Sequence, residues 1–161
     1  YRRGVPPGAP KQQAVWAFMV ALHTAMRSGE ILRMARSNVD LRRRVYRLDQ
    51  HKTDSHVGQR LVPFTPRAAR VLAVLDAAAA AAGRDRYFTI SDASRDRLFR
   101  KVLGHLMIEG FRFHDSRASA LTRLSRKYEV QVLARISGHT DISQLHKTYY
   151  RETAEDVAAR L

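Results

Sequence analysis

The order of hydrophobic patterns along the chain limits the folds that it can adopt. Residues 11–34 repeat apolar side chains at helical spacing, whereas residues 39–64 contain three short alternating or clustered segments that are typical of strands. Helical spacing returns after Thr65. We therefore expect a mainly α fold with a small antiparallel β-sheet, which is an α+β domain.

Two helices are predicted from their ends as well as from their spacing. The first begins at Lys11 and ends at the Ser28-Gly29 pair, because serine and glycine favour a break. Its expected apolar stripe consists of Val15, Phe18, Met19, Leu22 and Met26. The other begins with Thr65 as the N-cap and Pro66 as the first helical residue, and it continues to Gly83.

A further helix is expected after Ser91, whose hydroxyl can cap it. Its inward side chains are expected to be Phe99, Val102, Leu103 and Leu106. Its polar side is expected to consist of Arg95, Arg97, Arg100 and Lys101. The pattern fits a solvated face and a face that contacts a nucleic-acid backbone equally well.

The chain carries a large excess of positive charge. Its 29 Lys and Arg against 15 Asp and Glu give a net charge of +14, so a polyanion such as a nucleic acid is the expected partner. A hydrophobic content of 45% excludes a disordered basic tail. We expect no membrane span, because no apolar run reaches the length that one requires. The absence of cysteine excludes a thiol nucleophile and suits the cytoplasm.

The ends of the chain differ from its middle. Residues 1–10 contain three prolines and two glycines, and we interpret them as a linker. Residues 11–161 are then one domain, and residues 153–161 form a terminal amphipathic helix.

Two candidate functional residues lie three positions apart near the start of a predicted helix. If this helix begins near Asp115, His114 lies at its entry and Arg117 lies in its first turn. Both side chains can then face one spot, and that spot would suit an anion.

Three more candidates follow in the stretch that ends at residue 151. Gly138 ends an apolar helix, so that His139 is presented from a loop. Tyr149 and Tyr150 lie far enough along for the chain to fold back. Imidazoles, a guanidinium and a phenol make a poor metal site and a plausible phosphate site, so we predict no metal.

Candidates also occur earlier in the chain. Arg27 precedes a helix junction, where it can leave the core for a cleft, and Glu30 can hold its guanidinium in a bidentate pair. The same spacing fits a surface ion pair of little energetic value. Lys52 stands in the predicted hairpin tip His51–His56, where its ammonium could reach a groove or be solvated.

The residue inventory favours one kind of chemistry. Neither a GxxxxGK[ST] nor a GxGxxG phosphate loop occurs, and the acidic residues are scattered rather than clustered as a metal-dependent nuclease requires. The remaining candidate reaction is phosphoryl transfer without a metal. In such a reaction, fixed Arg and His donors stabilise the negative charge of the transition state. A tyrosine would be the nucleophile, and a lysine could protonate the leaving 5′ oxygen.

Five separated motifs occur in the order known from one family: TAMRSGEIL, HKT before a VPF strand, FHDSRASALTRL, LARISGHTDIS and TYYR. Over residues 11–161 the chain resembles the catalytic domain of the tyrosine recombinases, the phage integrase family. The resemblance implies site-specific cleavage and rejoining of DNA through a 3′-phosphotyrosyl intermediate, without metal, ATP or another cofactor. It also implies the cytoplasm of a prokaryotic cell or of a phage-infected host.

The resemblance implies roles for the upstream candidates. Arg27 looks like the first catalytic arginine, with Glu30 in support, and Lys52 looks like the general acid. Arg27, Lys52 and Arg117 are expected to contact DNA, and His51 and His56 are the other histidines expected to touch a phosphate.

The downstream candidates match the remaining motifs. His114 and Arg117 match the family's H-x-x-R, and His139 matches the histidine of its turn. The family usually places its tyrosine nine residues beyond that histidine, a position that is threonine here. Aligning the terminal helix instead favours Tyr149 as the nucleophile over Tyr150, with a one-residue insertion before it.

The implied partner is double-stranded DNA, bound by a homotetramer, whereas the isolated chain is expected to be monomeric. Residues 1–10 would then connect to an N-terminal DNA-binding domain that this sequence lacks. Two alternatives stay open: a basic DNA- or RNA-binding module without catalysis, and a type IB topoisomerase that relaxes supercoils.

Overall fold

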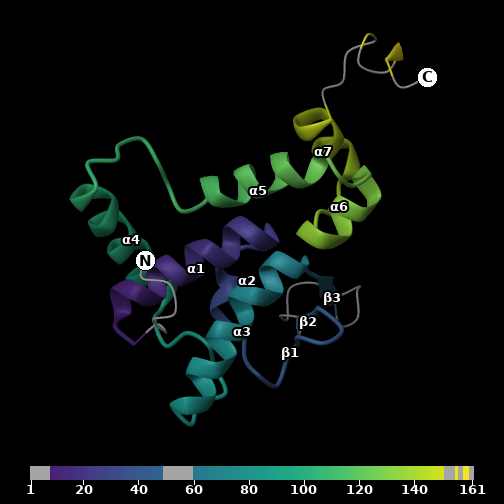
Figure 1. The fold of residues 1–161 in the computed structure, drawn as a ribbon. Helices are drawn as coiled ribbons and strands as arrows, with labels where there is room; N and C mark the ends of the chain where they lie inside the picture. Colours follow the sequence, from purple (N-terminus) through teal and green to yellow (C-terminus); the bar gives the residue numbers. More distant parts are fainter. Residues whose placement is uncertain (1–7, 49–59, 151–154, 156–157, 160–161) are drawn as a thin grey trace.

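The computed structural model describes residues 8–48, 60–150, 155 and 158–159. Its helices are α1 (Pro10–Thr24), α2 (Ser28–Leu32), α3 (Pro66–Ala81), α4 (Asp92–His105), α5 (Asp115–Ser125), α6 (Val130–Ser137) and α7 (Ile142–Tyr149). Its strands are β1 (Val39–Asp40), β2 (Val45–Leu48) and β3 (Arg60–Pro63). The expected α+β class is confirmed, with the small sheet at one side of the helices (Figure 1).

The sheet is antiparallel in the order β1-β2-β3. Val39 pairs with Tyr46, and Tyr46 pairs with Val62, so that the three side chains lie on one face. All three are buried, and the Tyr46 hydroxyl donates to the carbonyl oxygen of Glu30 in α2 at 3.2 Å. The buried face of the sheet is thereby fixed to the helix that carries one of the candidate residues.

Helix α1 lies at the centre of the fold and packs against α2, α3, α4 and α5. Its fully buried residues include Ala14, Trp16, Ala17, Val20 and Ala21. The predicted stripe is wrong in part: Met26, which follows the helix, is buried, whereas Val15, Phe18, Met19 and Leu22 are only partly buried. A helix with neighbours on several sides needs small residues where they approach closely, so a single stripe does not describe it.

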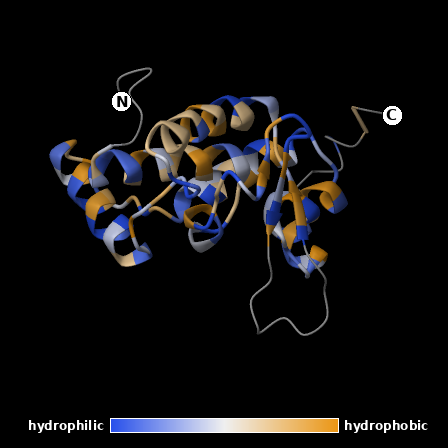
Figure 2. Ribbon diagram, turned by 90° about the horizontal axis from the view of Figure 1, so that it is seen from below, coloured by the Kyte–Doolittle hydropathy of each residue, from blue (hydrophilic) through white to orange (hydrophobic). Residues whose placement is uncertain are grey.

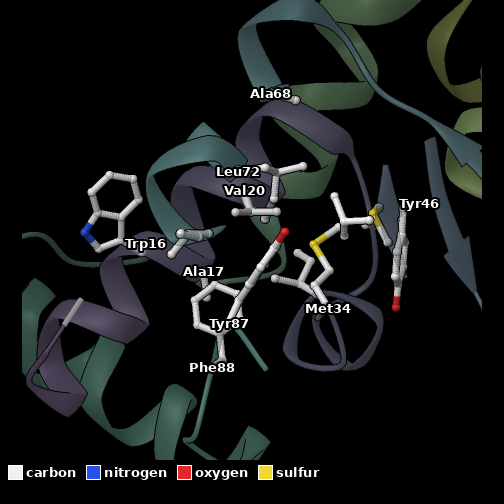
Figure 3. Close-up of a cluster of buried hydrophobic side chains, with 14 of the residues drawn as sticks. Trp16, Ala17, Val20, Met34, Tyr46, Ala68, Leu72, Tyr87 and Phe88 are labelled. Atoms are coloured by element: carbon white, nitrogen blue, oxygen red, sulfur yellow. The ribbon is translucent and has the colours of Figure 1, made fainter. Parts of the chain in front are cut away.

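The core forms two clusters rather than one. The first cluster contains residues of α1, α2, α3, α4 and the sheet. The side chains of Val20, Leu72 and Tyr87 lie within it (Figure 3). The second joins α5, α6 and α7 through residues such as Leu121, Leu133 and Leu145. The helices carry both hydrophobic and hydrophilic residues (Figure 2), as helices that bury only part of their surface do. The candidate site lies where the two clusters meet.

The end of α1 differs from the prediction. The helix stops at Thr24, because Ala25 adopts a left-handed conformation (φ 56°, ψ 19°) that ends it. Arg27 is therefore the N-cap residue of α2 and not the last residue of the first helix. Three residues later Glu30 accepts the Arg27 backbone N–H at 3.0 Å, which is the reciprocal half of a capping box.

The predicted N-caps of α3 and α4 are confirmed. The Thr65 hydroxyl accepts the N–H of Ala68 at 3.2 Å, and the Ser91 hydroxyl accepts the N–H of Ser94 at 3.2 Å. Hydroxyl caps are recognisable from sequence because they depend only on residues one turn apart.

Two expectations for α4 are wrong. Arg95, expected on the polar side, is 6% exposed, and its guanidinium lies over the Phe113 ring at 4.0 Å from the centroid. It pairs with Asp92 at 2.8 Å, so an aromatic face and a carboxylate together replace water. Leu106, expected to point inward, is 60% exposed, because α4 ends one residue before it.

Several expectations fall outside the described residues. These are the linker over residues 1–7, the hairpin tip His51–His56 with Lys52, and most of the terminal helix 153–161. Of that terminal segment the structure describes a helical hydrogen bond from Ala159 N–H to the Glu155 carbonyl at 3.0 Å. Within the described part of the chain, no helix is both long and apolar enough to span a bilayer.

Candidate active site

The first turn of α5 carries His114 and Arg117, as predicted. His114 is the N-cap residue and is exposed, whereas Arg117 points inward and is 5% exposed. The His114 carbonyl accepts the backbone N–H of Arg117 at 3.0 Å, which holds the two residues on one turn. Both residues line the same groove, although from different depths.

The guanidinium of Arg117 lies between the ends of two helices. It donates to the carbonyl oxygen of Ala25 at the end of α1, and its Nη2 donates to the Ser137 carbonyl at the end of α6 at 2.9 Å. Carbonyls at helix C-termini lack intrahelical partners and carry partial negative charge, so a cation suits them. Burial, followed by the charge of Arg27, lowers the Arg117 pKa to about 10, which leaves the side chain positive at neutral pH.

Arg27 lies at the edge of the same groove. Its Nη1 donates to Oε1 of Glu30 at 3.2 Å, and its Nη2 donates to the Gly138 carbonyl at 3.2 Å. The expected bidentate pair is wrong, because Oε2 of Glu30 accepts the backbone N–H of Arg27 instead of a second guanidinium N–H. The side chain of Arg27 remains half exposed, so that it can meet a ligand.

Arg60, at the start of β3, contacts the same carboxylate as Arg27, and it was not among the residues predicted from the sequence. Its Nη2 donates to Oε1 of Glu30 at 3.2 Å, so one buried carboxylate holds two guanidinium groups. A signal for it exists in the strand: Arg60 and Val62 are two residues apart, and residues at that spacing share a face. An arginine in register with a buried valine is an unusual choice unless it has a buried partner.

His139 follows the end of α6, which ends at Gly138 as predicted, and Gly138 adopts a left-handed conformation (φ 69°). Its Nδ1 lies 2.6 Å from the Ser137 hydroxyl, which in turn lies 2.7 Å from the Leu133 carbonyl. A hydroxyl has one proton, and the carbonyl can only accept it, so Nδ1 of His139 carries the hydrogen of the second bond. In the neutral imidazole Nε2 is therefore the unprotonated nitrogen.

The electrostatic surroundings favour the neutral form of His139. Burial lowers its pKa below the ordinary 6.5, and the charges of Arg117, Arg27 and Arg60 lower it further. At neutral pH the residue is thus a hydrogen-bond acceptor at Nε2, and it can act as a base.

Helix α7, which was not predicted from the sequence, brings a tyrosine back to the groove. The Asp141 carboxylate caps it by accepting the N–H groups of Ser143 and Gln144 at 2.9 and 3.2 Å. Leu145 is its buried anchor. Tyr149 ends the helix and lines the groove.

Tyr150 has a different environment from Tyr149. Its hydroxyl donates to the Tyr128 carbonyl at 2.5 Å, and its ring stacks on His146 with centroids 5.9 Å apart. Burial, together with the charge of Glu129, raises the pKa of Tyr150 above its ordinary value. Its hydroxyl is therefore engaged and harder to ionise, and Tyr150 is absent from the groove lining.

The groove has a volume of about 790 Å³. Of the six residues predicted to be catalytic, those that line it are Arg27, His114, Arg117, His139 and Tyr149. Its wall also includes Arg95, Arg100, Arg112 and Phe111. Lys52, His51 and His56 lie outside the described residues, so their predicted roles stay predictions.

The donor set of the groove suits an oxyanion. Five arginines and two histidines line the groove together with the phenol of Tyr149, and guanidinium groups match the oxygens of a phosphate geometrically. Within the described part of the chain, no three His, Cys, Asp or Glu side chains gather as ligands for a metal ion. The arrangement can stabilise the charge that develops when a phenol attacks a phosphodiester.

The sequence matches a known family over most of its length. The model of the phage integrase family matches residues 9–156. The chain is 38% identical over 151 residues to a "Putative integrase/recombinase" of Haemophilus influenzae, a match that covers 94% of this chain and 48% of the relative. It is 32% identical over 146 residues to the shufflon-specific DNA recombinase of Escherichia coli, covering 89% and 36%. The chain thus spans less than half of the length of these curated relatives.

The fold is similar to solved recombinase structures. The Tn1549 transposon integrase in complex with a circular intermediate DNA matches 92% of this chain and 58% of its own, with a TM-score of 0.71 and 15% identity. The XerH site-specific recombinase bound to its difH substrate matches 96% of this chain and 47% of its own, with a TM-score of 0.68 and 16% identity. At such identities the likeness shows a shared fold.

The lowered pKa of His139 makes stability depend on pH. As pH falls below 6.5, the unfolded chain binds a proton at this residue before the folded chain does, so the free energy of unfolding decreases. We expect the His139 ring to titrate below pH 6.5 in NMR spectra. Urea unfolding of His139→Gln should show a weaker loss of stability on acidification than the wild type, and a His139 midpoint above 6.5 would contradict this electrostatic account.

Proposed function

Because this chain belongs to the phage integrase family, we propose that it performs site-specific DNA recombination as a tyrosine recombinase. The observation that carries the proposal is that Tyr149 lines one groove together with Arg27, Arg117 and His139, although these residues are dispersed along the sequence. A binding module without chemistry offers no reason for a phenol to accompany these cations.

The two arginines are proposed to bind the scissile phosphate. A guanidinium has five N–H groups, and the contacts described above for Arg117 and for Arg27 each engage two of them. The others remain able to donate to phosphate oxygens while the backbone carbonyls hold both groups in place. Donors fixed before the reaction stabilise the extra negative charge of the transition state without reorganising. His114, exposed at the rim, is proposed to contact the same phosphate.

Tyr149 is proposed to be the nucleophile. Its phenolic oxygen forms a bond to phosphorus, and the bond from phosphorus to the 5′ oxygen breaks, which leaves a 3′-phosphotyrosyl link. A phenol needs to lose its proton to attack efficiently, and neutral His139 with an unprotonated Nε2 is the candidate acceptor. A 5′ hydroxyl from the partner strand then attacks the phosphotyrosyl bond, restores the phosphodiester and releases the tyrosine.

Lys52 is proposed to protonate the leaving 5′ oxygen, a role that rests on the sequence motif alone. Neighbouring His51 and His56 are proposed as further phosphate contacts on the same basis. The reaction as proposed requires no cofactor, because the energy of the broken bond is kept in the tyrosyl ester.

Double-stranded DNA is the proposed partner. The net charge of +14 supports a polyanion, and the Tn1549 integrase and XerH structures named above contain DNA. Site preference depends on distributed contacts and on DNA shape, so the target sequence is not encoded in the groove.

The nucleophile can be tested with a pool of nicked duplexes of randomised sequence, which avoids the need to know the target site. Wild-type protein should form an adduct that resists SDS, and peptide mapping should place the DNA on Tyr149. Tyr149→Phe should abolish the adduct, because the phenolic oxygen is lost, while DNA affinity stays nearly unchanged. Tyr150→Phe is the matched control and should retain the adduct; the reverse result would assign the chemistry to Tyr150.

The role of Lys52 predicts a chemical rescue. Lys52→Ala should slow adduct formation on ordinary DNA by about 10²- to 10⁴-fold, the usual contribution of a positioned acid. A duplex with a 5′-bridging sulfur at the scissile bond should restore the rate, because a thiolate leaves without a proton. If Lys52→Ala also forms the adduct slowly on the sulfur substrate, Lys52 is not the general acid.

The chain is proposed to assemble as a homotetramer on recombining DNA and to be monomeric alone. Sedimentation velocity of the protein with and without duplex measures this directly. A stable tetramer in the absence of DNA would contradict the proposed assembly.

A further inference from the structure

Arg60 is a cation close to the groove to which the proposed reaction gives no role. It begins β3, its side chain is 22% exposed, and it does not line the groove. Its Nη2 donates to Glu30, whereas its buried Nε has no partner among the described residues. An arginine held this far inside by one carboxylate needs a second reason for its position.

The second contact of Arg60 is with the turn that precedes His139. A Cβ built on Gly138 would lie 1.4 Å from Nη1 of Arg60 and 2.5 Å from its Cζ, so the guanidinium occupies the place of a side chain. Gly138 also has a φ of 69°, a conformation that favours glycine. The backbone conformation thus favours glycine at this position, and an added Cβ would have to displace the Arg60 guanidinium.

These contacts form a closed ring of interactions. Arg60 bonds to Glu30, Glu30 bonds to Arg27, Arg27 donates to the Gly138 carbonyl, and Gly138 lies against Arg60. The ring connects the sheet, the start of α2 and the turn between α6 and α7. Arg27 and the His139 turn therefore share one support, and Arg60 is its only member from the sheet.

We propose that Arg60 is a positioning residue of the strand-transfer site, which keeps Arg27, through Glu30, in register with the turn that carries His139. The inference rests on the proposed function, since it assigns Arg60 to the same reaction. Placement matters because a displacement of about 1 Å in a reacting group can reduce a rate by about 10²-fold. Arg60 acts through other residues, in agreement with its absence from the groove lining.

The first test separates rate from binding. With a pool of nicked duplexes at saturating concentration, Arg60→Met should slow adduct formation by about 10²-fold. Its DNA affinity should stay within about threefold, because many other basic residues contact phosphates. Arg60→Lys should recover part of the rate, since an ammonium can pair with Glu30 but cannot also cover Gly138. A loss of affinity that matches the loss of rate would make Arg60 a phosphate ligand and overturn the inference.

The second test uses Gly138. The Arg60 guanidinium is the far end of a long, flexible side chain, so the Cβ of Gly138→Ala should push it away from Glu30. Adduct formation should then be slowed as it is in Arg60→Met. The double variant should then be no slower than the slower single variant. Gly110→Ala is the matched control, because Gly110 has a φ of 70° and nothing within 4 Å of an added Cβ. Additive rate losses for Gly138→Ala and Arg60→Met would contradict the shared support.

The third test does not depend on catalysis. The charge of Arg60 contributes to the low pKa of His139, so in Arg60→Met the NMR titration midpoint of His139 should rise. A wild-type protein that forms no adduct would refute the proposed function, and the His139 titration would still report on Arg60. An unchanged midpoint in Arg60→Met would contradict the placement of Arg60 against the His139 turn, on which the inference depends, whatever the activity of the wild type.

Discussion

The burial of the Arg117 guanidinium between two helix ends is the interaction on which the site depends. Arg117 comes from α5, yet its donors satisfy the carbonyl of Ala25, which follows α1, and the carbonyl of Ser137 at the end of α6. An unsatisfied buried acceptor costs about 1–3 kcal/mol, so the packing of α5 against α1 and α6 and the placement of this cation stabilise each other. A residue expected from its motif to bind an anion thus also holds together the walls of the groove.

The fold was predictable where local rules decide the structure. The N-caps at Thr65 and Ser91, the strands and the left-handed Gly138 each depend on a few neighbouring residues, and the sequence shows these directly. The burial of α1 and of Arg95 depends instead on which elements surround them. A periodicity predicts one buried face, so it fails for a helix with neighbours on several sides.

The site shows the same division. The spacing of His114 and Arg117 within one helical turn was predictable, whereas their meeting with Arg27 and Tyr149 required the family resemblance. Arg60 was not predicted as a site residue, because its partners are distant in sequence and its segment was interpreted only as a strand. The choice between the two tyrosines rested on an alignment, and α7 supplies an independent reason: it directs the Tyr150 hydroxyl to a backbone carbonyl.

The hydroxyl of Ser137 has a consequence for acid–base chemistry that reaches beyond its own bonds. Its proton is committed to the Leu133 carbonyl, one helical turn back, and this choice dictates which nitrogen of the adjacent ring carries hydrogen. The tautomer of His139 is therefore a property of the geometry of α6 rather than of the solvent. In this protein the secondary structure itself selects which edge of the imidazole is basic.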